Sequence, residues 1–200
     1  MIIAVGGGSG AGKSTLIRRI IGRFDPGSAV VISMDHYYHD LSHLDPGERD
    51  ERDFDHPDAI EHELLRVHLQ QLAGGQAVDR PVYDFSSHTR QGTEELEPAP
   101  LILLDGIFAL SYADLNSLMD LRLFVDAAED LRLQRRLNRD AGERGRDRES
   151  VLRQFRESVK PGHDRHVEPG RMVADLVISW GGDVGPVLDD LEARIRALIK

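Results

Sequence analysis

The 200-residue sequence contains no cysteine, which excludes disulfide bonds and thiolate metal sites. It also lacks an apolar run long enough to cross a bilayer, since the strongest run, residues 100–110, is short and interrupted by Asp105. Basic charge is scarce as well: the net charge of −10 argues against a broad nucleic-acid-binding surface. The sequence starts directly with an apolar segment, which leaves no room for a signal or transit peptide. We therefore expect a cytoplasmic protein with no membrane or nucleic-acid partner.

What is present fits an ordinary globular protein. Hydrophobic residues make up 40% and charged residues 30% of the chain, and no repeat or linker divides it. The length suits a single domain over residues 1–200. One stretch departs from the acidic balance through its arginines, which are Arg132, Arg135, Arg136, Arg139, Arg144, Arg146 and Arg148. A local basic patch on an acidic protein suits a small polyanion better than a long one.

The most informative segment is a glycine-rich loop near the N-terminus. Residues 7–14 match the pattern G-x-x-x-x-G-K-[ST] at every defined position. An apolar run at residues 2–5 precedes the loop and predicts a buried strand, and residues 15–21 follow with helical spacing. The alternative is a glycine turn that opens a helix by chance, but a complete pattern in this setting argues against it.

Strand, glycine loop and helix in this order turn backbone N–H groups around phosphate oxygens and aim a helix N-terminus at them. Lys13 can reach the β- and γ-phosphates, and the hydroxyl of Ser14 can bind magnesium. We therefore predict a nucleoside-triphosphate site with Mg²⁺ as cofactor. It is formed by Gly7, Gly8, Ser9, Gly10, Ala11, Gly12, Lys13, Ser14 and Thr15.

Further apolar runs predict buried strands at residues 29–33, 101–105, 121–126 and 174–178. Helical segments alternate with them, so we expect an α/β fold with a five-stranded parallel sheet sandwiched by helices. Ligands bind beyond the carboxyl ends of the strands in such sheets. Asp35 follows the second strand, and Asp105 ends the third in the Walker B pattern, in which the acid lies beside magnesium. Together with Ser14, these two carboxylates are the predicted metal ligands.

Periodicity and turn residues assign the other segments. Helices are predicted at residues 13–24, 57–72, 127–139 and 184–200, a long polar loop at 39–56, a hairpin at 78–90 and a turn at 181–183. Pro81 excludes a central strand within the hairpin segment. His36, His39 and His43 could form a metal cluster, although solvated histidines are the commoner finding.

The arginine-rich helix is expected to break at Gly142 and Gly145, to resume until about Lys160, and to stop at Pro161-Gly162. Two helices joined by a glycine- and arginine-rich tip would make a lid over residues 136–160 or so. The alternative is a solvated helix pair held by Arg–Glu pairs. A triphosphate site elsewhere favours the lid, because it gives the arginines an anion to meet.

Several segments resemble the uridine kinases (uridine–cytidine kinases) of the P-loop kinase superfamily, from Gly6 to about Ile178. The segments are Asp35-His36-Tyr37-Tyr38, Phe54-Asp55-His56-Pro57-Asp58-Ala59, Pro81-Val82-Tyr83-Asp84-Phe85 with His88 and Arg90, and Arg139-Asp140 with Glu143-Arg144-Gly145-Arg146. The resemblance implies transfer of the γ-phosphate of ATP or GTP to the 5′-hydroxyl of uridine or cytidine. It also implies a homotetramer that pyrimidine triphosphates inhibit.

The resemblance further implies roles for individual residues. Asp35 matches the catalytic base, and Arg136, Arg139 and Arg144 match arginines that meet the triphosphate. Tyr38 matches a residue of the nucleoside pocket. Phe54, Tyr83 and Phe85 match aromatic residues that line the pocket for the nucleobase, and His88 matches a histidine that hydrogen-bonds the pyrimidine ring. Asp55 and Arg146 match the pair that holds the ribose hydroxyls, and Gln154 matches a further polar contact.

The chain departs from the family pattern at Asp105, where glutamate is usual, at Tyr37, where phenylalanine is common, and at the charged pair His163-Asp164. One rival function is a related kinase, phosphoribulokinase-like or pantothenate-kinase-like, that acts on another small alcohol. The aromatic residues argue against it, because a sugar phosphate would require more basic residues around the acceptor. The other rival is a non-catalytic nucleotide-binding regulatory protein, but the chain has no N-K-x-D guanine motif.

Overall fold

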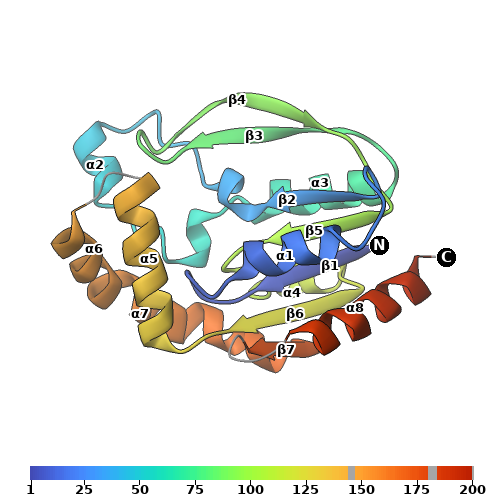
Figure 1. The fold of residues 1–200 in the computed structure, drawn as a ribbon. Coiled ribbons are helices and arrows are strands. Elements are labelled where there is room, and N and C mark those ends of the chain that lie inside the picture. Colours follow the sequence, from blue (N-terminus) through green and yellow to red (C-terminus); the bar gives the residue numbers. More distant parts are fainter. Residues whose placement is uncertain (144–146, 180–183, 200) are drawn as a thin grey trace.

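The structure is a computed structural model that describes residues 1–143, 147–179 and 184–199. Its centre is the predicted five-stranded parallel sheet, with the strand order β2-β5-β1-β6-β7 (Figure 1). The strands are β1 (Ile2–Gly6), β2 (Ala29–Ser33), β5 (Leu101–Asp105), β6 (Leu121–Asp126) and β7 (Leu176–Ser179). A separate antiparallel ribbon consists of β3 (Val78–Asp84) and β4 (Thr89–Leu96).

Helices cover both faces of the sheet because successive residues of its strands point to opposite sides. Ile3 and Val5 of β1 pack with α1 (Lys13–Ile21) and α8 (Gly185–Leu198). Ile2 and Ala4 belong instead to the core beneath α3 (His62–Ala73) and α4 (Ala113–Asn116). This two-sided burial explains why the strand sequences are continuous apolar runs.

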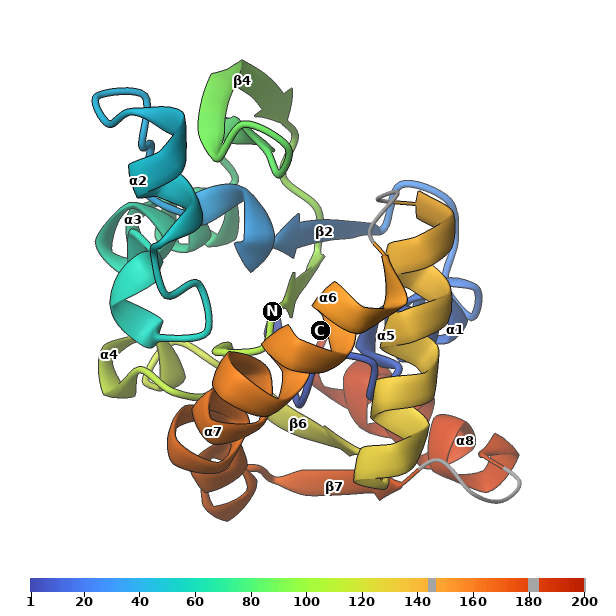
Figure 2. The same cartoon turned by 90° about the vertical axis from the view of Figure 1, so that its left-hand side faces the viewer.

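The remaining helical segments gather at one end of the sheet. They are α2 (Pro46–Asp50), α5 (Glu129–Glu143), α6 (Arg148–Gln154) and α7 (Lys160–Gly162). The arrows of β5 and β6 point toward this end, on the left of Figure 1. Figure 2 faces it and shows α2 and the ribbon at the upper left and α5 and α6 toward the right. The carboxyl ends of the strands therefore face the segments in which the sequence places the acceptor pocket and the lid.

The predicted elements are present, but several of their boundaries were wrong. The first helix ends at Ile21 rather than at residue 24, and the loop at 39–56 contains the short helix α2. The segment at 57–72 begins as a 3₁₀ turn, η2 (Pro57–Ala59), before α3 starts at His62. Tyr38 and Ile60 form an isolated antiparallel bridge at this break, which holds residue 60 in an extended conformation. Pro81 lies in a two-stranded ribbon at a register shift and not in a central strand, as predicted.

The largest correction concerns the end of the second helix of the predicted lid. Pro161 and Gly162 do not stop it: α6 continues through the π-helical turn η3 (Phe155–Val159), α7, a second π-helical turn, η4 (His163–Val167), and the 3₁₀ segment η5 (Glu168–Met172). Proline usually breaks a helix interior because it has no N–H for the i→i−4 hydrogen bond, but Pro161 comes directly after the π-helical turn η3, where the hydrogen bonds are already out of the α-helical register. Gly142 likewise lies inside α5 and does not interrupt it, whereas Gly145 and the turn at 181–183 lie outside the described residues.

Candidate active site

The glycine-rich loop between β1 and α1 has the backbone shape that the pattern predicts. Gly7, Gly10 and Gly12 have φ angles of 133°, 79° and 106°, in the region that side chains rarely adopt. A Cβ at Gly7 would also lie 2.3 Å from the carbonyl oxygen of Val125. Gly12 is the residue before α1, so the N-terminus of this helix opens directly from the loop.

The ammonium group of Lys13 folds back over this loop. Its Nζ donates to the carbonyl oxygens of Gly7 and Gly8 at 3.0 and 3.2 Å. Burial lowers the pKa of Lys13, and the charges of Asp105 and Asp35 oppose that shift. The lysine therefore lies within the electrostatic reach of both predicted metal carboxylates.

The sheet register explains why the two carboxylates lie near the loop. Asp105 ends β5 and pairs with Val5 of β1 on one side and Ser33 of β2 on the other. Asp35 lies in the 3₁₀ turn η1 (Met34–Tyr37), which begins directly after β2. The hydroxyl of Ser14 donates to Oδ2 of Asp105 at 2.9 Å.

These oxygens fit a magnesium ion. Mg²⁺ prefers hard oxygen ligands and usually binds one or two carboxylates together with water and substrate phosphates. Among the described residues, no group of three or more histidine, cysteine, aspartate or glutamate side chains could hold a metal ion. Ser14, Asp105 and Asp35 thus offer a sparse set of ligands of the kind that phosphate-bound Mg²⁺ uses. His39 and His43 are exposed, and the ring of His36 accepts the Tyr83 N–H at 3.4 Å, so these histidines form no metal cluster in this part of the chain.

A single cavity of about 310 Å³ unites the loop with the predicted acceptor residues. The predicted site residues that line it are Ser9, Gly10, Gly12, Lys13, Ser14, Thr15, Asp35, Tyr38, Phe54, Asp55, Tyr83, Phe85, His88, Asp105, Arg136, Arg139 and Gln154. Gly7, Gly8 and Ala11 are in the same loop but do not line the cavity. Arg144 and Arg146 lie outside the described residues.

One end of the cavity is walled by aromatic rings. Phe54 and His88 stack with their ring centroids 4.3 Å apart, and Tyr38 and Tyr83 lie 5.3 Å apart. The rings of Phe85 and Tyr83 meet edge to face at 5.3 Å. The hydroxyl of Tyr83 and Nδ1 of His88 are 3.3 Å apart, and the Tyr38 hydroxyl donates to the Phe54 carbonyl at 3.1 Å. Burial raises the pKa of Tyr38 and, to about 12, that of Tyr83, so both phenols remain neutral donors at pH 7.

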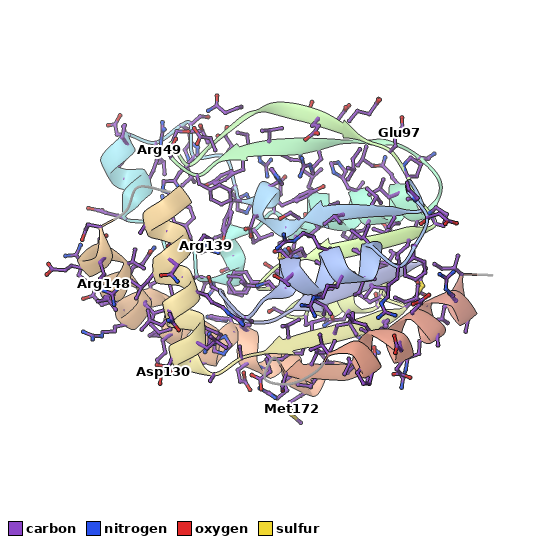
Figure 3. All side chains as sticks on the ribbon, in the orientation of Figure 1. Arg49, Glu97, Asp130, Arg139, Arg148 and Met172 are labelled. Carbon is purple, nitrogen blue, oxygen red and sulfur yellow. The ribbon has the colours of Figure 1, made fainter. Side chains whose placement is uncertain are left out.

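Arginines of α5 attach this helix to the glycine-rich loop at residues 7–14, called the donor loop below because it would bind the phosphate donor. Arg136 donates to the Ser9 hydroxyl at 3.1 Å and to the side-chain oxygen of Gln154 at 2.9 Å. Arg139, labelled on α5 in Figure 3, donates to the fully buried Asp140 at 3.0 Å. The guanidinium groups of both arginines therefore line the cavity from α5 while bonded to neighbouring side chains.

Three further residues line the cavity that were not predicted from the sequence as site residues, namely Gly106, Ile107 and Arg135. Arg135 donates to the carbonyl oxygens of Gly10 and Ala11 at 3.2 and 3.0 Å and so stabilises the loop. Its position beside Arg136 in the basic stretch was a usable signal. Gly106 follows Asp105 against Met34, where a Cβ would lie 2.6 Å from the Cβ of that residue. Only the packed structure reveals that requirement.

A phosphate loop on a five-stranded parallel sheet, with carboxylates at neighbouring strand ends and an arginine-bearing helix above, is the arrangement of a P-loop kinase. The chain belongs to the Phosphoribulokinase / Uridine kinase family, whose sequence profile matches residues 2–185.

Comparison with known proteins agrees with this assignment. The chain is 40% identical to a protein named uridine kinase from Staphylococcus aureus (strain JH9) over 199 residues, 99% of this chain and 96% of the relative. Its fold is similar to that of a possible uridine kinase from Bacillus stearothermophilus, with a TM-score of 0.61, 16% identity and coverage of 89% and 88% of the two chains. Phosphoribulokinase from Rhodobacter spheroides is also similar, with a TM-score of 0.63, 17% identity and coverage of 89% and 69%.

Proposed function

We propose that this protein is a uridine kinase that transfers the γ-phosphate of ATP or GTP to the 5′-hydroxyl of uridine or cytidine. The observation that carries the proposal is the single cavity, which is lined by residues of the donor loop, by Asp35 and by the aromatic side chains. The relative named uridine kinase, 40% identical over nearly the full chain, supports a uridine kinase activity.

The donor would occupy the loop end of the cavity. Backbone N–H groups of the loop and the N-terminus of α1 would hold its phosphates, with Lys13 as the point charge. Ser14 and Asp105, with Asp35, would hold Mg²⁺, which when bound neutralises charge on the phosphate oxygens. Arg136 and Arg139, together with Arg144, would add positive charge around the transferred group.

The acceptor would occupy the aromatic end. Phe54, Tyr83 and Phe85 would enclose the flat base, Tyr38 would complete the pocket, and His88 would hydrogen-bond the ring. Asp55 with Arg146 would hold the ribose hydroxyls, and Gln154 would add a polar contact. All of these residues would contact uncharged groups of the nucleoside, namely its base and its ribose hydroxyls.

Asp35 would act between the two ends as the catalytic base. Phosphoryl transfer proceeds through a loose transition state, so positioning and charge neutralisation supply most of the catalysis. The carboxylate of Asp35 would orient the 5′-hydroxyl and accept its proton late in the reaction. The protein would form one domain over residues 1–200, with a lid at about residues 136–160. This lid would close over the phosphate donor and exclude water, which would otherwise hydrolyse the donor.

The distribution of charge in the cavity disfavours the rival acceptors. Its cationic side chains are Lys13, Arg135, Arg136 and Arg139 of α1 and α5, and the first three of them bond residues of the donor loop. The acceptor end is lined by aromatic rings, His88 and Asp55, which suit a neutral nucleoside better than a sugar phosphate or pantothenate. The cellular setting that fits is cytoplasmic pyrimidine salvage by a homo-oligomer, a tetramer by resemblance. In the described residues, no helix has the length and apolar character needed to cross a membrane.

A coupled assay of ADP release with Mg²⁺ and ATP tests the proposal on a panel of acceptors. We expect turnover with uridine and cytidine and much less with adenosine or guanosine. Lys13→Ala is the control, since loss of the phosphate-binding ammonium group should abolish every activity of this site. Turnover with ribulose 5-phosphate or pantothenate, but none with uridine, would overturn the proposal in favour of a related kinase. No turnover with any acceptor, alongside tight ATP binding, would indicate a regulatory protein.

A further inference from the structure

Ser158 lies beside Asp55, a carboxylate among the acceptor residues that line the cavity. Its hydroxyl donates to Oδ2 of Asp55 at 2.5 Å and lies 3.5 Å from Oδ1 of Asp53. Asp55 lines the cavity, whereas Ser158 does not, so the serine contacts the carboxylate from behind. Asp55 is further held through its backbone N–H, which donates to Oδ1 of Asp53 at 2.9 Å.

The irregular helix after α6 explains how Ser158 comes to face Asp55. Gln154 ends α6 and lines the cavity, and Ser158 follows four residues later in the π-helical turn η3. The buried side chains of Phe155 and Val159 anchor this turn in the core. Single π-helical turns inside helices are frequently found at functional sites.

Gly162 fixes the same loop from the next turn of the helix. A Cβ at this position would lie 2.6 Å from the carbonyl oxygen of Asp55 and 3.0 Å from its Cβ. The backbone of residue 55 therefore packs directly on Gly162, while its side chain meets Ser158. Two separate contacts hold Asp55 against one helix, which is the continuation of the arginine-bearing lid segment.

A partly buried carboxylate needs such support. Burial raises the pKa of Asp55, and the hydrogen bond from Ser158 is the largest opposing influence. A hydrogen bond to one carboxylate oxygen also limits rotation of the group and leaves its other oxygen, Oδ1, to accept from a ligand. Ser158 thus favours the charged form of the carboxylate and limits the directions that it can take.

We propose that Ser158 is a positioning residue for sugar recognition: by holding Oδ2 of Asp55, it aims Oδ1 at the ribose hydroxyls and favours ribonucleosides over deoxyribonucleosides. The inference rests on the proposed nucleoside kinase activity. It assigns no contact between Ser158 and the substrate. Its effect is transmitted through Asp55 alone.

The kinetic test compares uridine with 2′-deoxyuridine and 3′-deoxyuridine in the wild type, Ser158→Ala and Ser158→Thr. We expect Ser158→Ala to lower kcat/KM for uridine about ten-fold, as for loss of a hydrogen bond to a charged group, mainly through KM. At least one deoxynucleoside should be affected less than two-fold, so that the selectivity ratio shrinks. Ser158→Thr keeps the hydroxyl and should keep the ratio. Ser117→Ala is the matched control, because it removes an exposed serine hydroxyl that donates to Asp114 O in α4, away from the cavity.

If Ser158→Ala lowered kcat/KM equally for all three nucleosides, or did not lower it, the proposal would be overturned. A serine with a purely structural role would not affect the selectivity between ribose and deoxyribose. The double variant Ser158→Ala/Asp55→Asn should discriminate no less than Asp55→Asn alone, because Ser158 acts through Asp55. An additional loss of selectivity in the double variant would contradict this route.

A second measurement needs no substrate, so it separates this inference from the proposed function. Carbon-13 NMR titration of the aspartate carboxyl groups, with Asp55→Asn for assignment, reports the pKa of Asp55 in the free protein. We expect Ser158→Ala to raise that pKa and Ser158→Thr to leave it unchanged. An unchanged pKa in Ser158→Ala would show that the hydroxyl does not act on Asp55, whatever the acceptor is. A raised pKa in a protein that does not phosphorylate uridine would place the fault in the proposed acceptor, and the sugar-recognition proposal would fall with it.

Discussion

Ser14 and Asp105 are 91 positions apart in the chain, yet the hydroxyl of the first donates to the carboxylate of the second at 2.9 Å. Asp105 occupies a position where the family usually has a glutamate. Although the aspartate side chain is shorter, it still reaches the hydroxyl of Ser14. The pair brings a hydroxyl and a carboxylate oxygen together at the end of the central strands. It is the structural basis for the metal prediction below.

Asp105→Asn should raise the Mg²⁺ concentration needed for half-maximal activity by about ten-fold, because it removes a charged oxygen ligand or water-binding group. The measurement is the initial rate at fixed ATP across a magnesium titration. Asp105→Glu keeps the charge and should remain near the wild type. An unaltered magnesium dependence in the asparagine variant would remove Asp105 from the metal site.

Asp35→Asn should lower kcat by about 10²–10⁴-fold, the usual contribution of a general base, while uridine binding stays within a few-fold of the wild type. The amide preserves the shape of the side chain but cannot accept the proton of the 5′-hydroxyl. Steady-state kinetics and calorimetric binding separate the two effects. Turnover close to the wild-type rate would exclude Asp35 as the base.

His88→Ala should change the ratio of kcat/KM between uridine and cytidine, because these bases differ in the hydrogen-bonding groups of the pyrimidine ring. His88 stacks on Phe54 and lies beside the Tyr83 hydroxyl, so its ring can present a nitrogen at a fixed position in the cavity. Phe85→Leu is a useful control, since it alters the apolar wall but no hydrogen bond to the base. An equal loss for both nucleosides would leave His88 with a packing role only.

His68 predicts a pH dependence of stability. Its Nδ1 and the Tyr37 hydroxyl are 2.8 Å apart in the core, and burial lowers the pKa of His68 from its ordinary 6.5. The unfolded chain therefore binds a proton near pH 6.5 that the folded chain excludes. The stabilisation is complete above that pH and is lost as the pH falls below it, by at most about 1.4 kcal/mol per pH unit for one proton.

Urea unfolding of the wild type and His68→Gln at pH 7.5, 6.5 and 5.5 measures this contribution. The free energy of unfolding of the variant should fall less steeply with acidification, although the variant is less stable at pH 7.5. Tyr37→Phe leaves the histidine in place but removes its partner, and it should cost about 1 kcal/mol. Equal slopes in the wild type and His68→Gln would show that His68 does not take part in the acid loss.

Local patterns predicted the parts of the fold and site that local physics determines. The donor loop needs particular glycines, and buried parallel strands need continuous apolar runs, so the residues at 7–14 and 101–105 identified both features. The aromatic positions came from the family resemblance, and the structure brings them into one cavity with the loop.

Features that depend on packing between distant segments could not be predicted from the sequence. Pro161 and Gly162 are typical helix terminators, but the helix continues because π-helical turns flank them and Asp55 packs on Gly162. Arg135 belongs to the basic stretch, but its bonds to Gly10 and Ala11 depend on the placement of α5 beside the loop and could not be predicted. In both cases the decisive partner is more than a hundred residues away.

The strand order has a consequence for the distance between donor and acceptor. Because β5 lies between β1 and β2, the donor loop and Asp35 begin two strand spacings apart, about 10 Å. The hydrogen bonds between neighbouring strands keep this distance constant. Ribbon, α2 and the loop around Asp55 attach outside this sheet, so they can vary to receive other alcohols without changing the reach of the phosphoryl group. A common sheet can in this way serve kinases whose acceptors have little in common.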